Sequence, residues 1–112
     1  TMEVLKAMEA HAGIRIKELR VDGGAAANNL LMQLQADILD TTVVRPQIIE
    51  TTAMGAAYLA GLAVVYWNDT QEIAAKWKID RRFETGINQE ERTLEIENWN
   101  RAVRTAHAWT TP

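Results

Sequence analysis

The sequence feature that most constrains the fold is a pair of glycines, Gly23 and Gly24, between an apolar run and a helix-forming run. Leu19 and Val21 are alternating apolar positions, which is typical of a short strand. From the alanines onward, apolar residues recur at helical spacing, which predicts a helix over residues 26–39. A strand, a tight turn and a helix in this order predict an α/β unit whose turn lies at one edge of a sheet.

This turn has the features of a nucleotide-binding surface. Gly24 has no side chain, so a flat ligand can lie close to its backbone, and the N–H groups of a helix start attract anions. Asn28 can direct its amide to the same place. An ordinary strand-to-helix turn, in which glycine only relieves strain, explains the pattern about equally well, because a diglycine before a helix is a weak motif. Asp22 is expected to order the turn rather than to act as a base.

The first half of the chain alternates helical and extended segments. A helix is expected over residues 1–12, and Gly13 ends it in the manner of a C-terminal glycine. Residues 42–44 are β-branched strand material, which Pro46 ends. Alternation of this kind predicts parallel strands joined by right-handed crossovers, with helices packed on the sheet.

A helix rich in small residues is predicted over residues 53–67, with Thr51 or Thr52 as its cap. Its two glycines lower helix propensity by roughly 1 kcal/mol each. Close packing on the sheet or on another helix is the expected compensation, and contact with a ligand is the alternative. The four tryptophans are expected to anchor peripheral helices onto the sheet. Three further segments are expected to be helical, irregular and helical in turn: residues 70–78, 79–87 and 89–109.

Composition and missing motifs exclude several classes of protein. The 112 residues carry a net charge of −3 and no basic stripe, which argues against nucleic acid as a partner. There is no cysteine for a disulfide or a thiolate metal site, which fits a cytoplasmic protein, and no serine nucleophile. The uncharged run 51–68 contains glycines and lacks flanking basic residues, so a buried helix is expected rather than a membrane span. The turn lacks both the Walker ending and the third glycine of a dinucleotide fingerprint.

Longer runs of residues carry a resemblance to a known family. The most diagnostic run is Val21-Asp22-Gly23-Gly24-Ala25, followed by the paired Asn28-Asn29. The other matching positions are residues 13–15, 35–38, 44–46 and 52–64, and Trp99, Ala102, Val103 and Trp109. Together they cover essentially the whole chain and resemble the C-terminal region of the glycerol kinases, a branch of the FGGY carbohydrate kinases. Xylulose kinases typically have Gly-Gly-Gly-Ala in this turn, and Val65 departs from the glycine that glycerol kinases often have.

The resemblance implies an α/β, actin-like or ribonuclease-H-like fold. Residues 1–112 would form the nucleotide-side portion of the C-terminal domain, without the N-terminal lobe. It also implies transfer of the γ-phosphate of ATP to glycerol, with magnesium. Gly24 and Asn28 match the family positions that contact the adenosine of ATP or ADP. The general base, the glycerol-binding residues and the metal-linked carboxylates match positions upstream of Thr1, so no catalytic or metal-binding residue is assigned here.

Further expectations concern partners and the state of the chain. Because residue 1 is Thr, the chain is expected to be a piece of a longer one, inactive by itself. The resemblance implies a cytoplasmic homo-oligomer and, more weakly, a regulatory phosphotransferase protein that docks on residues 85–94. Two alternatives stay open. One is an FGGY kinase that acts on another sugar or polyol, and the other is a non-catalytic nucleotide-binding or regulatory module.

Overall fold

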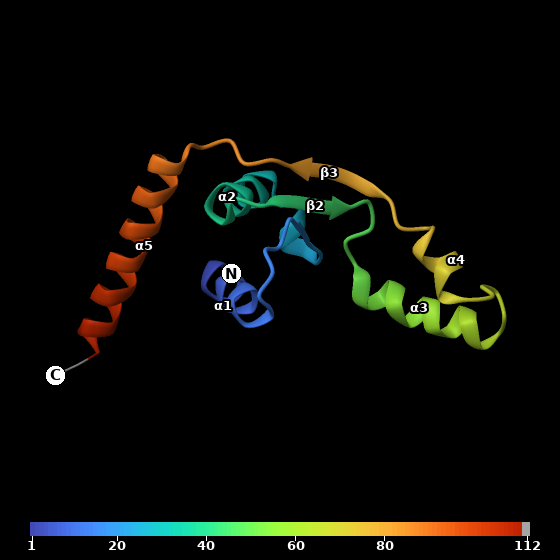
Figure 1. Ribbon diagram of the computed structural model, residues 1–112. Coiled ribbons are helices and arrows are strands. Elements are labelled where there is room, and N and C mark those ends of the chain that lie inside the picture. The colour runs from blue at the N-terminus through green and yellow to red at the C-terminus, as the bar shows by residue number, and fades with distance from the viewer. Residues whose placement is uncertain (111–112) are drawn as a thin grey trace.

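The computed structural model of the chain describes residues 1–110, which contain one three-stranded sheet with α5 at one end of the molecule and α3 and α4 at the other (Figure 1). The described elements are α1 (Met2–Ala12), β1 (Glu18–Arg20), the 3₁₀ turn η1 (Gly24–Ala27), α2 (Asn29–Leu39), β2 (Thr42–Pro46), α3 (Thr51–Ala63), α4 (Thr70–Ala74), β3 (Ile79–Phe83) and α5 (Gln89–Trp109). The molecule is elongated, with principal extents of 58 × 36 × 31 Å. The sheet therefore links two arms that have few contacts with each other.

The sheet has the order β1-β2-β3. β1 and β2 are parallel, with Leu19 opposite Val43, and α2 forms the crossover between them. This part of the predicted α/β fold is confirmed. β3 runs antiparallel to β2, with Phe83 opposite Val43, so the prediction that residues 79–87 are irregular was wrong for residues 79–83. Phe83 is the only buried residue of β3. The other positions are exposed and mostly charged, as is common for edge strands, so the sequence lacks the apolar alternation that would predict a strand.

The core lies between the sheet and the layer formed by η1 and α2. It consists of one cluster of buried side chains: Ala26, Met32, Ala36, Val43 and Phe83. Val43 and its neighbour Val44 are both fully buried, although their side chains point to opposite faces of β2. The central strand is therefore covered on both faces, and burial of each valine contributes about 1.5–3 kcal/mol.

The helix ends differ from the predictions at identifiable residues. α1 ends at Gly13, whose φ of 70° is left-handed, as predicted. α2 begins at Asn29 rather than at residue 26, because residues 24–27 form a 3₁₀ turn and Asn28 caps the helix. α5 spans Gln89–Trp109 as predicted, with Asn88 as its cap.

In the second half, α3 begins at Thr51 after Glu50, so neither Thr51 nor Thr52 is its cap. α3 also stops at Ala63, because Val65 takes a left-handed φ of 61° that turns the chain back. α4 covers Thr70–Ala74 only, and Asp69, not Thr70, supplies its cap. The predictions of helices over residues 53–67 and 70–78 were therefore right in type and wrong in extent.

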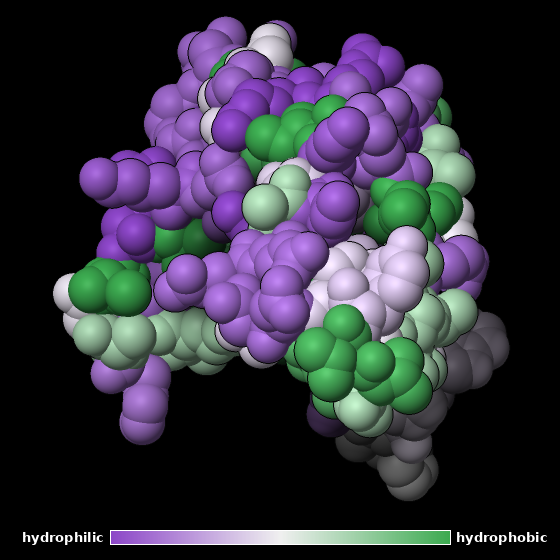
Figure 2. Space-filling view, turned by 90° about the vertical axis from the view of Figure 1, so that its right-hand side faces the viewer, coloured by the Kyte–Doolittle hydropathy of each residue, from purple (hydrophilic) through white to green (hydrophobic). Residues whose placement is uncertain are grey.

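The expected packing of α3 on the sheet is not found among residues 1–110. Most of α3 is exposed, with Leu59 71% accessible, and a Cβ built on Gly55 would meet open space. Figure 2, which faces the α3–α4 end, shows hydrophobic side chains at the surface between hydrophilic ones. Gly61 does have a packing role, because the ring of Trp67 lies where its Cβ would be.

Of the four tryptophans, only Trp77 contacts the sheet as expected, while Trp67 packs within the α3 arm and Trp99 joins two helices. The ring of Trp67 packs edge-on against Tyr58, and the guanidinium of Arg20 lies 4.3 Å from the ring centre of Trp77. Trp99 donates a hydrogen bond from α5 to α1. Trp109 is 90% exposed and anchors nothing in the part of the chain that is described, so the anchoring prediction was wrong there.

Candidate nucleotide-binding turn

The turn between β1 and α2 is held from the segment that follows β2. Beyond β1, the N–H of Val21 still bonds to Val44 O at 3.1 Å. Gly23 then takes a φ of 84°, which requires glycine, and donates its N–H to Ile49 O at 2.7 Å. The carboxylate of Asp22 accepts a hydrogen bond from Thr51 Oγ1 at 2.5 Å. As expected, Asp22 orders the turn.

The outer face of the turn is open. Gly24 is exposed, and a Cβ built on it would meet no atom within 4 Å. Ala25 and Ala27 are also exposed, whereas Ala26 points into the core. The turn therefore presents a surface with very small side chains, on which a flat ligand can approach the backbone.

Asn28 stands at the other end of η1 from Gly24 and caps α2. Its Oδ1 accepts a hydrogen bond from the N–H of Leu31 at 3.1 Å, and its carbonyl accepts one from Met32. The Nδ2 group makes no hydrogen bond within residues 1–110, and the residue is exposed. The structure thus has both predicted site residues exposed on the same turn, and leaves the amide donors of Asn28 without a partner among the described residues.

One functional candidate that sequence reasoning missed is Arg45, on β2. Its guanidinium contacts the carbonyls of Ala26 and Ala27 and the side chain of Asn29, at the end of the turn. Arg45 belongs to the Val-Arg-Pro run that resembles the family. Nothing local in the sequence, however, predicts that this arginine contacts residues 16–19 positions earlier in the chain.

The loop before α5, where a regulatory partner was predicted, is fixed by Arg92. This side chain is only 7% exposed. Its Nε donates to the carbonyl of Asp37 at 2.6 Å, and its Nη2 donates to Thr85 Oγ1 at 2.9 Å and lies 3.3 Å from Asp40 Oδ1. The segment from residue 85 to α5 is therefore a fixed surface on the end of α2.

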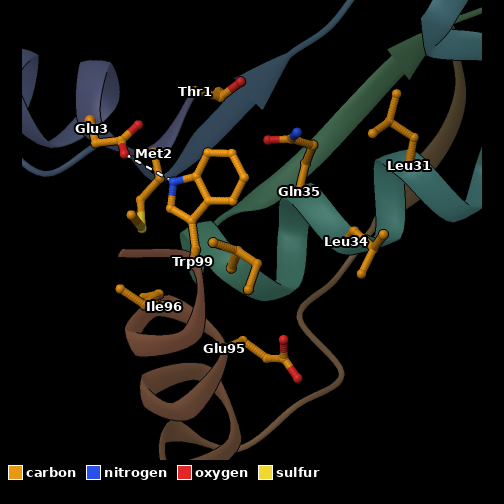
Figure 3. A pocket seen from close by; sticks show the side chains of 10 residues that line it. Thr1, Met2, Glu3, Leu31, Leu34, Gln35, Glu95, Ile96 and Trp99 are labelled. Carbon is orange, nitrogen blue, oxygen red and sulfur yellow. Dashed lines mark hydrogen bonds between the residues drawn. The ribbon is translucent and has the colours of Figure 1, made fainter. Parts of the chain in front are cut away.

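A cavity of about 470 Å³ lies away from the turn, between α1, α2 and α5 (Figure 3). Its wall is mainly apolar, with Leu31, Leu34 and Ile96 among the lining residues. Trp99 crosses it and donates from Nε1 to Glu3 Oε1 at 3.1 Å. Since Trp99 links α5 to α1 here, this cavity is part of the packing of α5.

No metal centre is found within residues 1–110, where no group of three or more His, Cys, Asp or Glu side chains is placed to hold an ion. In the same residues, no helix is both long and apolar enough to cross a membrane. Glu18 has a shifted pKa. The hydrogen bond from Arg82, with a smaller contribution from Arg20, lowers the pKa of its carboxyl. This pair joins β1 to β3 and takes no part in the turn.

Comparison with known proteins gives the chain its relatives. It is 61% identical over 109 residues to the glycerol kinases of Paraburkholderia phytofirmans and Paraburkholderia xenovorans, and 58% identical to that of Burkholderia pseudomallei. Each of these alignments covers 97% of this chain and 22% of the relative. The chain thus spans about a fifth of the length of these curated relatives.

Solved structures share the fold. The crystal structure of Plasmodium falciparum glycerol kinase with ADP matches 92% of this chain and 21% of its own, with a TM-score of 0.71 and 30% identity. A ligand-bound xylulose kinase from Lactobacillus acidophilus matches 83% of this chain and 19% of its own, with a TM-score of 0.62 and 21% identity. The predicted fold class is confirmed.

A family model, described as the C-terminal domain of the FGGY family of carbohydrate kinases, matches residues 1–64. This match covers more than half of the chain, and it includes the whole of the diglycine turn, α2, β2 and α3. The chain therefore belongs to the FGGY family of carbohydrate kinases.

Proposed function

We propose that this chain is the nucleotide-side part of the C-terminal domain of a kinase that transfers the γ-phosphate of ATP to glycerol, giving glycerol 3-phosphate. The identity of 61% to glycerol kinases supports glycerol as the acceptor. The observation that carries the proposal is the turn itself: Gly24 has an uncovered backbone face and Asn28 has exposed, unused amide donors. The fold is shared with a glycerol kinase whose structure contains ADP.

The two site residues have distinct roles in this proposal. Gly24 lets the adenosine of ATP or ADP lie against the backbone, because no side chain fills the space above it. Asn28 donates from Nδ2 to an acceptor of the nucleoside, while its Oδ1 keeps capping α2. The capping bond fixes the amide plane, so the donors are oriented before the nucleotide arrives. This preorganisation lowers the entropy cost of binding.

Phosphoryl transfer depends mainly on positioning and on electrostatic stabilisation of the transferred group. This chain supplies the positioning of the nucleotide. Magnesium supplies charge neutralisation at the phosphates in such reactions, and no residue of this chain is assigned to it. The glycerol site and the base belong to the rest of the protein. Because the reaction uses ATP, we also propose a cytoplasmic location. Assembly into a homo-oligomer and the docking of a regulatory protein on residues 85–94 also remain predictions.

The alternatives differ in what the full-length protein would do. A kinase for another sugar is supported by the general carbohydrate-kinase family model and by the fold shared with xylulose kinase at 21% identity, which is weaker support than 61% identity to glycerol kinases. A non-catalytic nucleotide-binding module would bind ADP without phosphorylating any polyol. Assaying the full-length protein with ATP and either glycerol or xylulose distinguishes these possibilities.

The test of the site uses Asn28→Ala in the full-length protein. We expect the KM for ATP to rise about tenfold, which corresponds to ~1.4 kcal/mol, a typical loss for one hydrogen bond to a ligand. The KM for glycerol should not change, because in this proposal the free amide donors of Asn28 serve the nucleotide and not glycerol. Asn100→Ala, an exposed asparagine on α5, is the matched control and should change neither constant. A defect confined to glycerol would contradict the assignment.

A further inference from the structure

Arg45 contacts the turn between β1 and α2 from the side of the sheet. It lies on β2, on the same face as Val43, which belongs to the core against η1 and α2, and its side chain is only 11% exposed. Its Nη1 lies 2.8 Å from Asn29 Oδ1, 3.0 Å from Ala26 O and 3.4 Å from Ala27 O. One nitrogen atom of a largely buried guanidinium therefore donates to acceptors from the residues on both sides of Asn28.

The chain needs a donor at this place because it changes direction here. η1 ends at Ala27, and Asn28 is extended, with φ −79° and ψ 107°. The N–H of Leu31 bonds to the side chain of Asn28, and the N–H of Met32 bonds to its carbonyl. The carbonyls of Ala26 and Ala27 precede this first turn of α2, and the partly buried carbonyl of Ala26 would be costly to leave without a partner. Arg45 donates to both.

The guanidinium is itself fixed from β3. The register pairs Arg45 with Arg81 but Pro46 with Ile79, which leaves Asp80 without a partner on β2. A bulge of this kind redirects a side chain from its regular face. Here it brings Asp80 Oδ2 to 2.9 Å from Arg45 Nε.

An aromatic contact completes the cradle of the guanidinium. Its central carbon lies 5.2 Å from the ring centre of Phe83, within the range of a cation–π contact. Arg45 is thus held by a carboxylate on one side and by a buried ring on β3, while Nη1 faces the turn. The planar fork of arginine suits this set of contacts, whereas a lysine ammonium offers only a point charge.

We infer that Arg45 is a positioning residue for nucleotide binding, and that Asp80 on the bulge of β3 orients it. The inference rests on the proposed function, because it assigns to Arg45 an effect on the affinity for ATP. Ala27 and Asn29 flank Asn28, so the contacts of Arg45 fix the backbone that carries the nucleotide-facing amide. Arg45 itself does not touch the nucleotide; it acts through the turn.

The test compares Arg45→Lys, Arg45→Gln and Asp80→Asn in the full-length protein. Both Arg45 variants should raise the KM for ATP by about tenfold and leave the KM for glycerol unchanged. Asp80→Asn should give a smaller rise in the same constant. Arg82→Gln is the matched control, because Arg82 makes an equally close ion pair, 2.8 Å from Glu18, on the other face of the sheet. It should leave the KM for ATP unchanged.

Two further measurements separate positioning from a general loss of stability. Amide hydrogen exchange should accelerate over residues 23–29 in Arg45→Lys and stay unchanged there in Arg82→Gln. The Kd for ADP, measured by calorimetry, should rise in parallel with the KM for ATP. Equal ADP affinity in wild type and in Arg45→Lys, or unchanged exchange over residues 23–29, overturns the inference even if an Arg45 variant lowers the melting temperature.

The failures of the two proposals are distinguishable. If Asn28→Ala weakens ATP binding and Arg45→Lys does not, the proposed function stands and the inference fails. If the full-length protein does not phosphorylate glycerol, the proposed function fails, and ADP affinity together with exchange over residues 23–29 still decides the role of Arg45. If Arg45→Gln does not fold, Arg45→Lys provides the same comparison.

Discussion

Arg92 is the most consequential side chain for the attachment of α5, and its removal should release the first turns of that helix. It is 7% exposed and reaches back to the end of α2, where its Nε bonds to the carbonyl of Asp37 at 2.6 Å. Its Nη1 bonds to Gln89 Oε1 at 2.7 Å and its Nη2 to Thr85 Oγ1 at 2.9 Å. The position at the C-terminus of α2 adds a favourable interaction with the helix dipole.

The magnitude of the effect follows from these contacts. Each buried acceptor that loses its donor costs about 1–3 kcal/mol, and Arg92 donates to several. At ~3 kcal/mol in total, protection of the local amides should fall by about a hundredfold, since each 1.4 kcal/mol is a factor of ten. Arg92→Met, which keeps the apolar stem, should therefore lose hydrogen-exchange protection over residues 84–96.

The control for this prediction is Arg101→Gln, which changes an exposed arginine on the same helix. Its exchange should match that of the wild type. The exchange protection of Arg92→Lys should lie between that of wild type and that of Arg92→Met. A lysine ammonium keeps the positive charge, but it cannot reach all the acceptors that the arginine contacts in different directions. Unchanged protection over residues 84–96 in Arg92→Met would refute the reasoning, because the loop and α5 would then be held by something other than this guanidinium.

Two further predictions concern the turn and the charge on the sheet. Gly24→Val should raise the KM for ATP without loss of stability, because the added side chain enters open space, whereas Gly23→Ala should destabilise the fold by about 1–2 kcal/mol because its φ of 84° is left-handed. Urea unfolding and ATP kinetics of both variants check this, and equal effects at both glycines would contradict it. Glu18 has a pKa below its ordinary 4.5, so its ion pair stabilises the fold above that value, and the contribution is lost as pH falls through the lowered pKa. The urea midpoint of wild type should therefore fall more than that of Glu18→Gln on acidification, and parallel curves would rule this out.

The sequence predicts those parts of the fold whose signals are local. The glycine pair, the apolar alternation before it and the β-branched run of β2 were enough to predict the parallel β1–α2–β2 unit, which is confirmed. The end of α1 at Gly13 and the extent of α5 could also be predicted, because a capping glycine and the apolar periodicity are visible in the local sequence. Both candidate site residues, Gly24 and Asn28, do lie on one exposed turn.

The remaining features depend on residues far apart in the chain. β3 has four exposed positions out of five, so its strand character comes from pairing with β2 rather than from its own pattern. The position of Arg45 depends on Asp80, which is 35 residues away and exposed. The small residues of α3 predicted a packed helix, but composition does not say which surface covers them.

The alternation of β3 imposes a strict limit on its length. Phe83 and Arg82 serve opposite faces: Phe83 lies in the core, and Arg82 pairs with Glu18 on the reverse side. Because neighbouring residues of a strand point in opposite directions, inserting or deleting one residue before Phe83 would exchange these duties. The aromatic ring would leave the core against α2, and an arginine would take its place. Homologous chains should therefore tolerate substitutions in β3 far better than any change in its number of residues.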